Sequence, residues 1–461
     1  MHAISRRRFL AATAAGALVL GASRTTRAAR KPNVLYVMTD QQRKDTLGCY
    51  GNTNTETPHY DALAAKGVLF TSCYATQPVC SPCRSSMVTG LFPNATTVME
   101  NNIPLPSTLF TWPRAFHEQG YKVGYVGKWH LGVDPVPDYF DLWRGFHTGW
   151  DHFIDKEPVY QNPGETEKAF AERIAAGDTS TNAGAENIGR YRPDLEADHA
   201  IAFIRSCGQD PFVCWLSFYP PHTPKTVPEE NLARYRGRYE SEEQDIYYAM
   251  VNRLDANVGR VMAAIDELGL REHTLVVCTA DHGENHPQRW NNHHKRLCYD
   301  QAANVPLIMS WPGVLPQGKR LDSLVSIADL APTILDLCGQ AWPETLHGQS
   351  AKRLLQGDAS GWHEDIFIQN VPYPDKSGGK EGVDLAMRER CVVTDRWKLI
   401  LNTTRPPELY DRTSAKPDET NVFGQPEAAQ VVPDLVKRLA AWGKKTDDVL
   451  TEQLIRQWGL G

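Results

Sequence analysis

The sequence has little of what marks a specialised class of protein. Only 10 of its 461 residues are cysteine, well below the density of a disulfide-rich scaffold. It has no excess of positive charge, because 49 Lys and Arg stand against 55 Asp and Glu, a formal charge of 49 − 55 = −6. A net acidic chain without a long basic run is unsuited to binding nucleic acid through its phosphates. It also has no internal repeat. At 461 residues we expect one large domain and a smaller one, because single cores stop growing near ~250 to 300 residues.

The first 28 residues are predicted to be an export signal. Three consecutive arginines at residues 6–8 precede an uncharged stretch at residues 9–22, and Ala28 ends a short cleavage-like sequence. The paired arginines before Phe9 resemble a twin-arginine signal. The apolar stretch has 14 residues, which as a helix reach ~21 Å and fall short of the ~30 Å hydrocarbon core of a bilayer. We therefore expect a periplasmic or secreted protein without a stable membrane anchor.

Short apolar runs alternate with helical patterns along the rest of the chain. Apolar residues recur every three or four positions from 247 to 268, which is typical of an amphipathic helix. Alternation of strands and helices predicts an α/β fold. A Pro- and Gly-punctuated stretch then precedes a change of pattern near residue 355, so we predict domains at residues 29–355 and 356–461. The predicted strands are residues 34–38, 123–126, 212–218, 274–278, 306–310, 390–394 and 397–401, and a closing amphipathic segment covers 431–442.

Polar residues follow four of the predicted strands, at the strand ends where open α/β sheets bind ligands. Carboxylate and amide oxygens suit a divalent ion such as Ca²⁺ or Mg²⁺, and imidazole adds a nitrogen ligand. Lys and Arg side chains can hold an oxyanion beside such an ion. Each residue taken singly would also suit a surface ion pair or a cap, but the joint pattern indicates a metal and anion site. The residues are Asp40 and Gln41, Lys128 and His130, His222, and Asp281 and His282, with Arg84 and Lys295 as further cations.

The segment from Cys80 to Gly90 admits three interpretations. Cys80 and Cys83 suit a Cys-x-x-Cys redox or metal pair. They equally suit a structural disulfide or buried thiols. In the third interpretation Cys80 alone matters, and Pro82 and Arg84 form its recognition context.

The third interpretation brings out a family resemblance. Cys80-x-Pro82-x-Arg84, followed by Thr89-Gly90, resembles the signature of the type I sulfatases of the alkaline-phosphatase-like superfamily, in which a modifying enzyme oxidises that cysteine to formylglycine. The resemblance continues in order over nearly the whole chain, from about residue 33 to residue 442. Its further matches are Asp40-Gln41, residues 47–51, 127–132, 221–224 and 281–284, Lys295 before Tyr299, Asp329 before Pro332-Thr333, and residues 397–400 and 408–411.

The resemblance implies both the fold and the chemistry. The fold would be a large α/β domain with a mostly parallel central sheet flanked by helices, plus a smaller C-terminal α+β domain with a short antiparallel sheet. One hydroxyl of an aldehyde hydrate would attack the sulfur of a sulfate ester, and the other, once deprotonated, would expel sulfate. The implied metal ligands are Asp40, Gln41, Asp281, His282 and modified residue 80; Arg84 would stabilise the hydrate, Lys128 and Lys295 would bind sulfate, His222 would assist the leaving alcohol, and His130 would be the base.

Two departures from the family pattern keep alternatives open. Gln41 stands where many members have a second acid, and His282 where they often have Asn. We expect Ca²⁺, with Mn²⁺ or Mg²⁺ as alternatives. The pairs Asp40-Gln41 and Asp281-His282 also resemble those of the related phosphonate monoester and phosphodiester hydrolases, which form an alternative enzyme class. A sugar-binding protein with unmodified residue 80 is the non-catalytic alternative, although every polar position that the chemistry needs is occupied.

The substrate class is expected from the export signal and from polar segments near the site. An exported enzyme with His and Trp near the site suits a sulfated carbohydrate better than an aryl ester. Residues 285–294 suit either the mouth of the pocket or a solvated loop, and residues 373–383 suit a loop over the site. The expected partners are the sulfate ester and a formylglycine-generating maturase.

Overall fold

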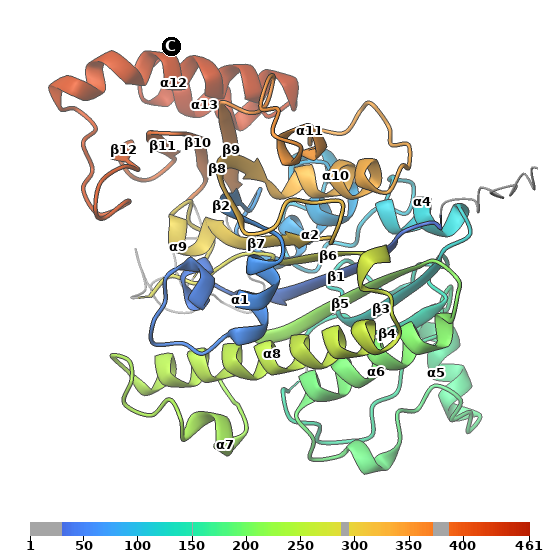
Figure 1. The fold of residues 1–461 in the computed structure, drawn as a ribbon. Coiled ribbons are helices and arrows are strands. Elements are labelled where there is room, and N and C mark those ends of the chain that lie inside the picture. Colours follow the sequence, from blue (N-terminus) through green and yellow to red (C-terminus); the bar gives the residue numbers. More distant parts are fainter. Residues whose placement is uncertain (1–29, 150, 287–294, 372–386) are drawn as a thin grey trace, which may run out of the picture. The chain divides into compact units, whose positions relative to one another are not determined.

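Figure 1 shows a computed structural model of the chain, which describes residues 30–149, 151–286, 295–371 and 387–461. Lys31–Gly461 forms one compact unit. The predicted export signal, most of residues 285–294 and all of residues 373–383 lie outside the described ranges. Within these ranges, none of the helices combines the length and apolarity needed to cross a bilayer.

An eight-stranded sheet forms the centre of this unit. Its strands are β1 (Asn33–Asp40), β2 (Val68–Tyr74), β3 (Lys122–Lys128), β4 (Leu142–Phe146), β5 (Phe212–Pro221), β6 (Thr274–Ala280), β7 (Asn304–Ser310) and β8 (Lys319–Ser326). The strand order is β4-β3-β5-β1-β6-β7-β2-β8. β1 pairs in parallel with β5 and β6, and β3 with β5 and β4, whereas β7 runs antiparallel to β6 and β2. The sheet is therefore mostly parallel, as predicted.

Helices cover both faces of this sheet. The α-helices up to residue 355 are α1 (Pro58–Ala65), α2 (Cys80–Thr89), α3 (Pro93–Thr96), α4 (Trp112–Glu118), α5 (Glu167–Ala175), α6 (Arg192–Cys207), α7 (Glu229–Leu232), α8 (Glu242–Glu267), α9 (Asp300–Ala303), α10 (Leu330–Leu337) and α11 (Lys352–Leu355). Apolar residues of α2, α4 and α10 share one core with the sheet, and those of α1, α6 and α8 share the other. Figure 1 shows these two layers, with α6 and α8 on one face and α2 and α10 on the opposite face.

A second sheet follows in the C-terminal part of the unit. It contains β9 (Asp365–Asn370), β10 (Glu389–Thr394), β11 (Trp397–Asn402) and β12 (Glu408–Asp411), all antiparallel, in the order β12-β11-β10-β9. The helices α12 (Pro426–Lys445) and α13 (Val449–Gln457) pack on one face of it. The other face packs against Leu297, Cys298 and Tyr299, so this sheet supports the segment that begins at Lys295.

The predicted fold class is confirmed. Each strand predicted from an apolar run corresponds to β1, β3, β5, β6, β7, β10 or β11, with ends that differ by no more than three residues. The helix predicted at residues 247–268 is α8, and the segment at 431–442 lies within α12. The boundary at residue 355 between two domains stays a prediction.

Candidate active site

The central sheet brings the predicted site residues to one edge. β3, β5, β1 and β6 are adjacent and parallel, so their carboxyl ends lie together. These ends deliver Lys128, His222, Asp40 and Asp281 respectively. The close approach of β3 to β5 requires Gly127, since a Cβ at that position would lie 1.9 Å from the carbonyl oxygen of Ser217.

Cys80 is the first residue of α2 and lies at the centre of the site. Its Sγ is 3.2 Å from Nε2 of His282, 3.4 Å from Nζ of Lys295 and 3.5 Å from Oδ1 of Asp40. Burial would raise the pKa of the Cys80 thiol, but the positive charges of Lys128, Lys295 and His282 bring it well below its usual value. The site therefore stabilises negative charge at residue 80, and the start of α2 adds backbone N–H groups to that effect.

Arg84 lies one turn further along α2 and joins several strands through hydrogen bonds. Its Nε donates to Oδ2 of Asp281 at 2.8 Å, and Nη2 donates to Oδ2 of Asp40 at 2.9 Å. Its Nη1 donates to Oγ of Ser217 at 3.0 Å and to the carbonyl oxygen of Lys128. Because all of these groups are buried, the fixed guanidinium fork holds both carboxylates in place.

Asp40 and Asp281 form a buried acidic pair. Burial, followed by the charge of Asp40, raises the pKa of Asp281. Burial alone would raise the pKa of Asp40 too, but Lys128, His222 and Arg84 lower it below its usual value. Ligand atoms of Asp40, Cys80, Asp281 and His282 all lie within 4.8 Å of one another, close enough to surround a single ion.

Lys295 joins three of the predicted residues. Its Nζ donates to Oε1 of Gln41 at 2.8 Å, lies 3.1 Å from Nε2 of His222, and contacts Sγ of Cys80. Burial and the adjacent charge of Lys295 lower the pKa of His222. Gln41 has φ 66° and is positioned through its backbone N–H, which donates to Oδ1 of Asp281 at 3.1 Å.

His130 completes the predicted set from the loop after β3. Its φ is 60°, and Oγ of Ser81, next to Cys80, donates to its carbonyl oxygen at 2.7 Å. The Nε2 atom is 2.9 Å from Oδ1 of Asn102. Burial, with the charge of Lys128, lowers the pKa of His130 to about 3. His130 is therefore neutral at ordinary pH.

The structure also places residues near the site that the sequence did not single out. Tyr219 and His152 pack around His222, and Ser217 accepts a hydrogen bond from Arg84. Lys225 donates from Nζ to Glu284 Oε2 at 2.6 Å and links the His222 loop to the segment after β6. Only Tyr219 and Ser217 carried a usable signal, because both lie at the end of a predicted strand.

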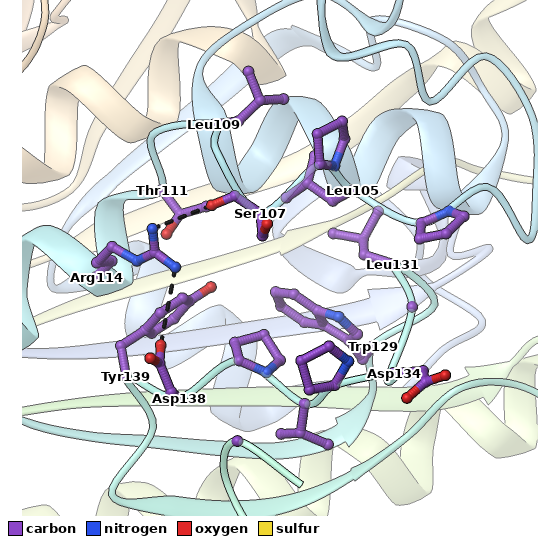
Figure 2. Close-up of a pocket in the computed structure, with 17 residues that line it drawn as sticks. Leu105, Ser107, Leu109, Thr111, Arg114, Trp129, Leu131, Asp134, Asp138 and Tyr139 are labelled. Carbon is purple, nitrogen blue, oxygen red and sulfur yellow. Dashed lines mark hydrogen bonds and ion pairs between the residues drawn. The ribbon is translucent and has the colours of Figure 1, made fainter. Parts of the chain in front are cut away.

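A cavity of about 370 Å³ adjoins the loop that carries Lys128 and His130. Figure 2 shows Trp129 at this cavity, with Leu105 and Leu131 beside it and Arg114 and Asp138 across from it. Trp129 belongs to the aromatic core and is 3% exposed. Its neighbours Lys128 and His130 lie in the active site instead, so this segment lines both the cavity and the active site.

Positive side chains surround Cys80 at the strand ends, a setting in which an anionic ester can be bound and cleaved. The α/β fold and this site therefore define an enzyme that hydrolyses anionic esters. The Sulfatase family model matches residues 32–340, and the model of the N-sulphoglucosamine sulphohydrolase C-terminal region matches residues 288–445. The chain belongs to the sulfatase family and is a sulfuric ester hydrolase, which confirms the resemblance found in the sequence.

Individual relatives agree with this family. The chain is 27% identical over 440 residues to an ulvan-active sulfatase of Formosa agariphila, covering 89% of this chain and 80% of the relative. It is 24% identical over 502 residues to an N-acetylglucosamine-6-O-sulfatase of Bacteroides thetaiotaomicron, covering 91% and 87%.

Solved structures share the fold. One, in complex with its substrate D-glucosamine-2-N,6-O-disulfate, matches with a TM-score of 0.74 at 22% identity over 91% of this chain and 99% of the other. A phosphonate monoester hydrolase of Agrobacterium radiobacter matches with a TM-score of 0.71 at 23% identity over 90% and 96%. At these identities, the likeness concerns the fold and does not separate sulfate from phosphonate esters.

Proposed function

We propose that this protein is an exported hydrolase of a sulfated carbohydrate. The observation that carries the proposal is the position of Lys295, whose Nζ contacts Cys80 Sγ, Gln41 and His222 together. A cation placed between a nucleophile and a histidine suits an ester with one anionic end and one alcohol end. The relatives named for N-acetylglucosamine-6-O-sulfate and glucosamine disulfate support a sugar as that alcohol.

Residue 80 would act as formylglycine, formed from Cys80 by a maturase. The aldehyde hydrate supplies a nucleophilic hydroxyl and a second hydroxyl through which the sulfate is released. Arg84, which is itself held by its contacts to both carboxylates, would stabilise and position the hydrate. His130, neutral and close to residue 80, would accept the proton that release requires.

Lys128 and Lys295 would bind the sulfate oxygens, and His222 would assist the leaving alcohol. Both lysines contribute positive charge at Cys80, as the lowered pKa of its thiol indicates. His222 lies beside Lys295, so the sulfate and the leaving oxygen would be held on adjacent groups. These roles match the negative charge that develops on the leaving oxygen when the S–O bond breaks.

The donor set fits one divalent metal ion, and we propose Ca²⁺, with Mn²⁺ or Mg²⁺ as alternatives. Asp40 and Asp281 are buried and close, and burial, followed by the charge of Asp40, raises the pKa of Asp281, so a bound cation would favour the ionised carboxylates. Asp40, Asp281, His282, Gln41 and residue 80 would hold the ion. Bound there, it would neutralise an approaching sulfate ester.

Ester preference tests the proposed function directly. Sulfate release from sulfated monosaccharides and from 4-nitrophenyl sulfate is compared with the hydrolysis of phenyl phosphonate and phosphodiester substrates, using protein co-produced with a maturase. We expect kcat/KM for the sulfate esters to exceed that for the phosphorus esters by at least 100-fold. A preference for the phosphorus esters would contradict the proposal and indicate a phosphonate monoester or phosphodiester hydrolase.

Mass spectrometry tests the state of residue 80 and the export signal. The peptide that contains residue 80 should carry the mass of formylglycine in active preparations. A population with only unmodified cysteine and full activity would contradict the mechanism. The N-terminus of protein recovered from the periplasm should begin near residue 29, whereas retention of the full chain in the cytoplasm would contradict export.

A further inference from the structure

The Tyr219 ring contacts two residues that the proposed reaction uses. Its ring stacks on the ring of His222, with centroids 4.9 Å apart and an interplanar angle of 24°. Nζ of Lys128 lies over the same ring, 4.7 Å from its centroid. Tyr219 is 4% exposed, so water screens neither contact strongly.

The ring itself is fixed from other directions. His152 meets it edge-on at 5.0 Å and 71°, and Phe146 meets it at 6.0 Å and 73°. His152 also holds the backbone of His222, because its Nε2 lies 2.8 Å from the His222 carbonyl oxygen. Burial lowers the pKa of His152 to about 4, so this imidazole is neutral and Nε2 donates. The position of His222 is therefore set twice, at its backbone by His152 and at its ring by Tyr219.

The hydroxyl of Tyr219 contributes less than its ring. Burial raises the pKa of Tyr219 to about 12, so the phenol stays neutral at the pH of the reaction. The contacts to Lys128 and His222 both use the face of the ring, which phenylalanine would keep. A leucine would keep much of the apolar volume but offer no π-face to a cation.

We propose that Tyr219 is a positioning residue that fixes the distance between the sulfate-binding Lys128 and His222, which assists the leaving alcohol. This inference rests on the proposed function, because it assigns those two roles. Lys128 neutralises one end of the ester and His222 serves the other, so their spacing decides whether both act on the same bond. A displaced His222 would leave more negative charge on the leaving oxygen in the transition state.

The experiment compares Tyr219→Leu and Tyr219→Phe with the wild type on aryl sulfates of increasing phenol pKa. We expect Tyr219→Leu to lower kcat/KM ~10-fold for the best leaving group and at least ~100-fold for the poorest, since assistance to the leaving oxygen matters most there. Tyr219→Phe should stay within ~3-fold of the wild type throughout. Tyr121→Leu is the matched control, because Tyr121 is a buried ring at the opposite end of β3, just before Lys122. It should lower thermal stability without changing the dependence on leaving group.

Two outcomes would overturn the inference. One is a Tyr219→Leu enzyme whose dependence on leaving group equals that of the wild type, and the other is a Tyr219→Phe enzyme as impaired as Tyr219→Leu. If no ester is cleaved and the proposed function fails, the inference can still be tested by a measurement that needs no turnover. The ring protons of His222, assigned by NMR, should shift in Tyr219→Leu through loss of the ring current and stay in place in Tyr121→Leu. Unchanged His222 shifts in Tyr219→Leu would also contradict the inference.

Discussion

Nζ of Lys128 lies 2.5 Å from Oδ2 of Asp40, and Nη2 of Arg84 donates to the same oxygen atom. All three side chains are at most 2% exposed. One carboxylate oxygen thus serves two cations, which fixes the lysine at the strand end before any ester binds. Buried pairs of this kind pay a large desolvation cost, so their main effect is on geometry and on what happens when one partner is removed.

Lys128→Met tests this shared contact. The substitution leaves Asp40 buried with one cation fewer, so we expect the free energy of unfolding to fall by about 3 kcal/mol and KM for a sulfate ester to rise. Urea unfolding at neutral pH and steady-state kinetics measure the two effects. Adding Asp40→Asn should restore part of the stability but none of the activity. A Lys128→Met protein as stable as the wild type would contradict the coupling.

The two cysteines of α2 are expected to differ sharply. Cys83 belongs to the apolar core, and burial raises the pKa of its thiol, whereas the Cys80 thiol faces the cations. Cys83→Ala should keep sulfate release within about 3-fold of the wild type and lower stability by about 1 kcal/mol. Cys80→Ala should abolish sulfate release. Equal losses in the two variants would instead favour a Cys-x-x-Cys redox pair.

Removal of metal should lower both activity and stability. A chelator applied to the purified enzyme should reduce its melting temperature, and Ca²⁺ at 100 times its Kd should restore about 2.7 kcal/mol of stability. In Asp281→Asn the melting temperature should no longer respond to Ca²⁺, while Asp45→Asn, at an exposed acid outside the site, should respond like the wild type. A melting temperature indifferent to both chelator and Ca²⁺ in the wild type would contradict the metal site.

Glu196 on α6 is expected to make stability depend on pH. It is 3% exposed, and burial raises its pKa from 4.5 to about 8, against the opposing charge of Arg192. Between these two values the folded chain holds a proton that the unfolded chain has lost. The contribution to stability is therefore complete below pH 4.5 and is lost as pH rises towards 8.

Glu196→Gln should remove that dependence. Urea unfolding at pH 5 and pH 8 should show that the wild type loses on the order of 4 kcal/mol more than Glu196→Gln over this interval. Glu172→Gln, at an exposed position of α5, should behave like the wild type. A pH dependence that is identical in Glu196→Gln and the wild type would show that Glu196 titrates normally.

The sequence predicted seven of the twelve strands in the described residues, and the site residues at the ends of four of them, because both follow from local patterns. Asp40, Lys128, His222 and Asp281 each come directly after an apolar run, and adjacent parallel strands must end together. The direction of β7 could not be predicted, since an apolar run reads the same in parallel and antiparallel pairing. β4 was missed because its five residues include an arginine and a glycine.

Contacts between distant segments also could not be predicted from the sequence. His152 is 70 residues from the carbonyl oxygen that its ring contacts, and the loop that carries it has no apolar pattern. Glu196 shows no local sign of burial, because it stands among charged residues at the start of α6. Such positions depend on how helices and loops pack against the sheet, which no short pattern encodes.

Every residue of α2, from Cys80 to Thr89, is buried. A modifying enzyme could not reach residue 80 in the folded chain, so the oxidation proposed for it has to come first. A chain that folds before it is modified would keep its thiol permanently. The fraction of active molecules in a cell would then depend on the rate of modification relative to the rate of folding. A substitution that slows folding would raise that fraction without changing the site.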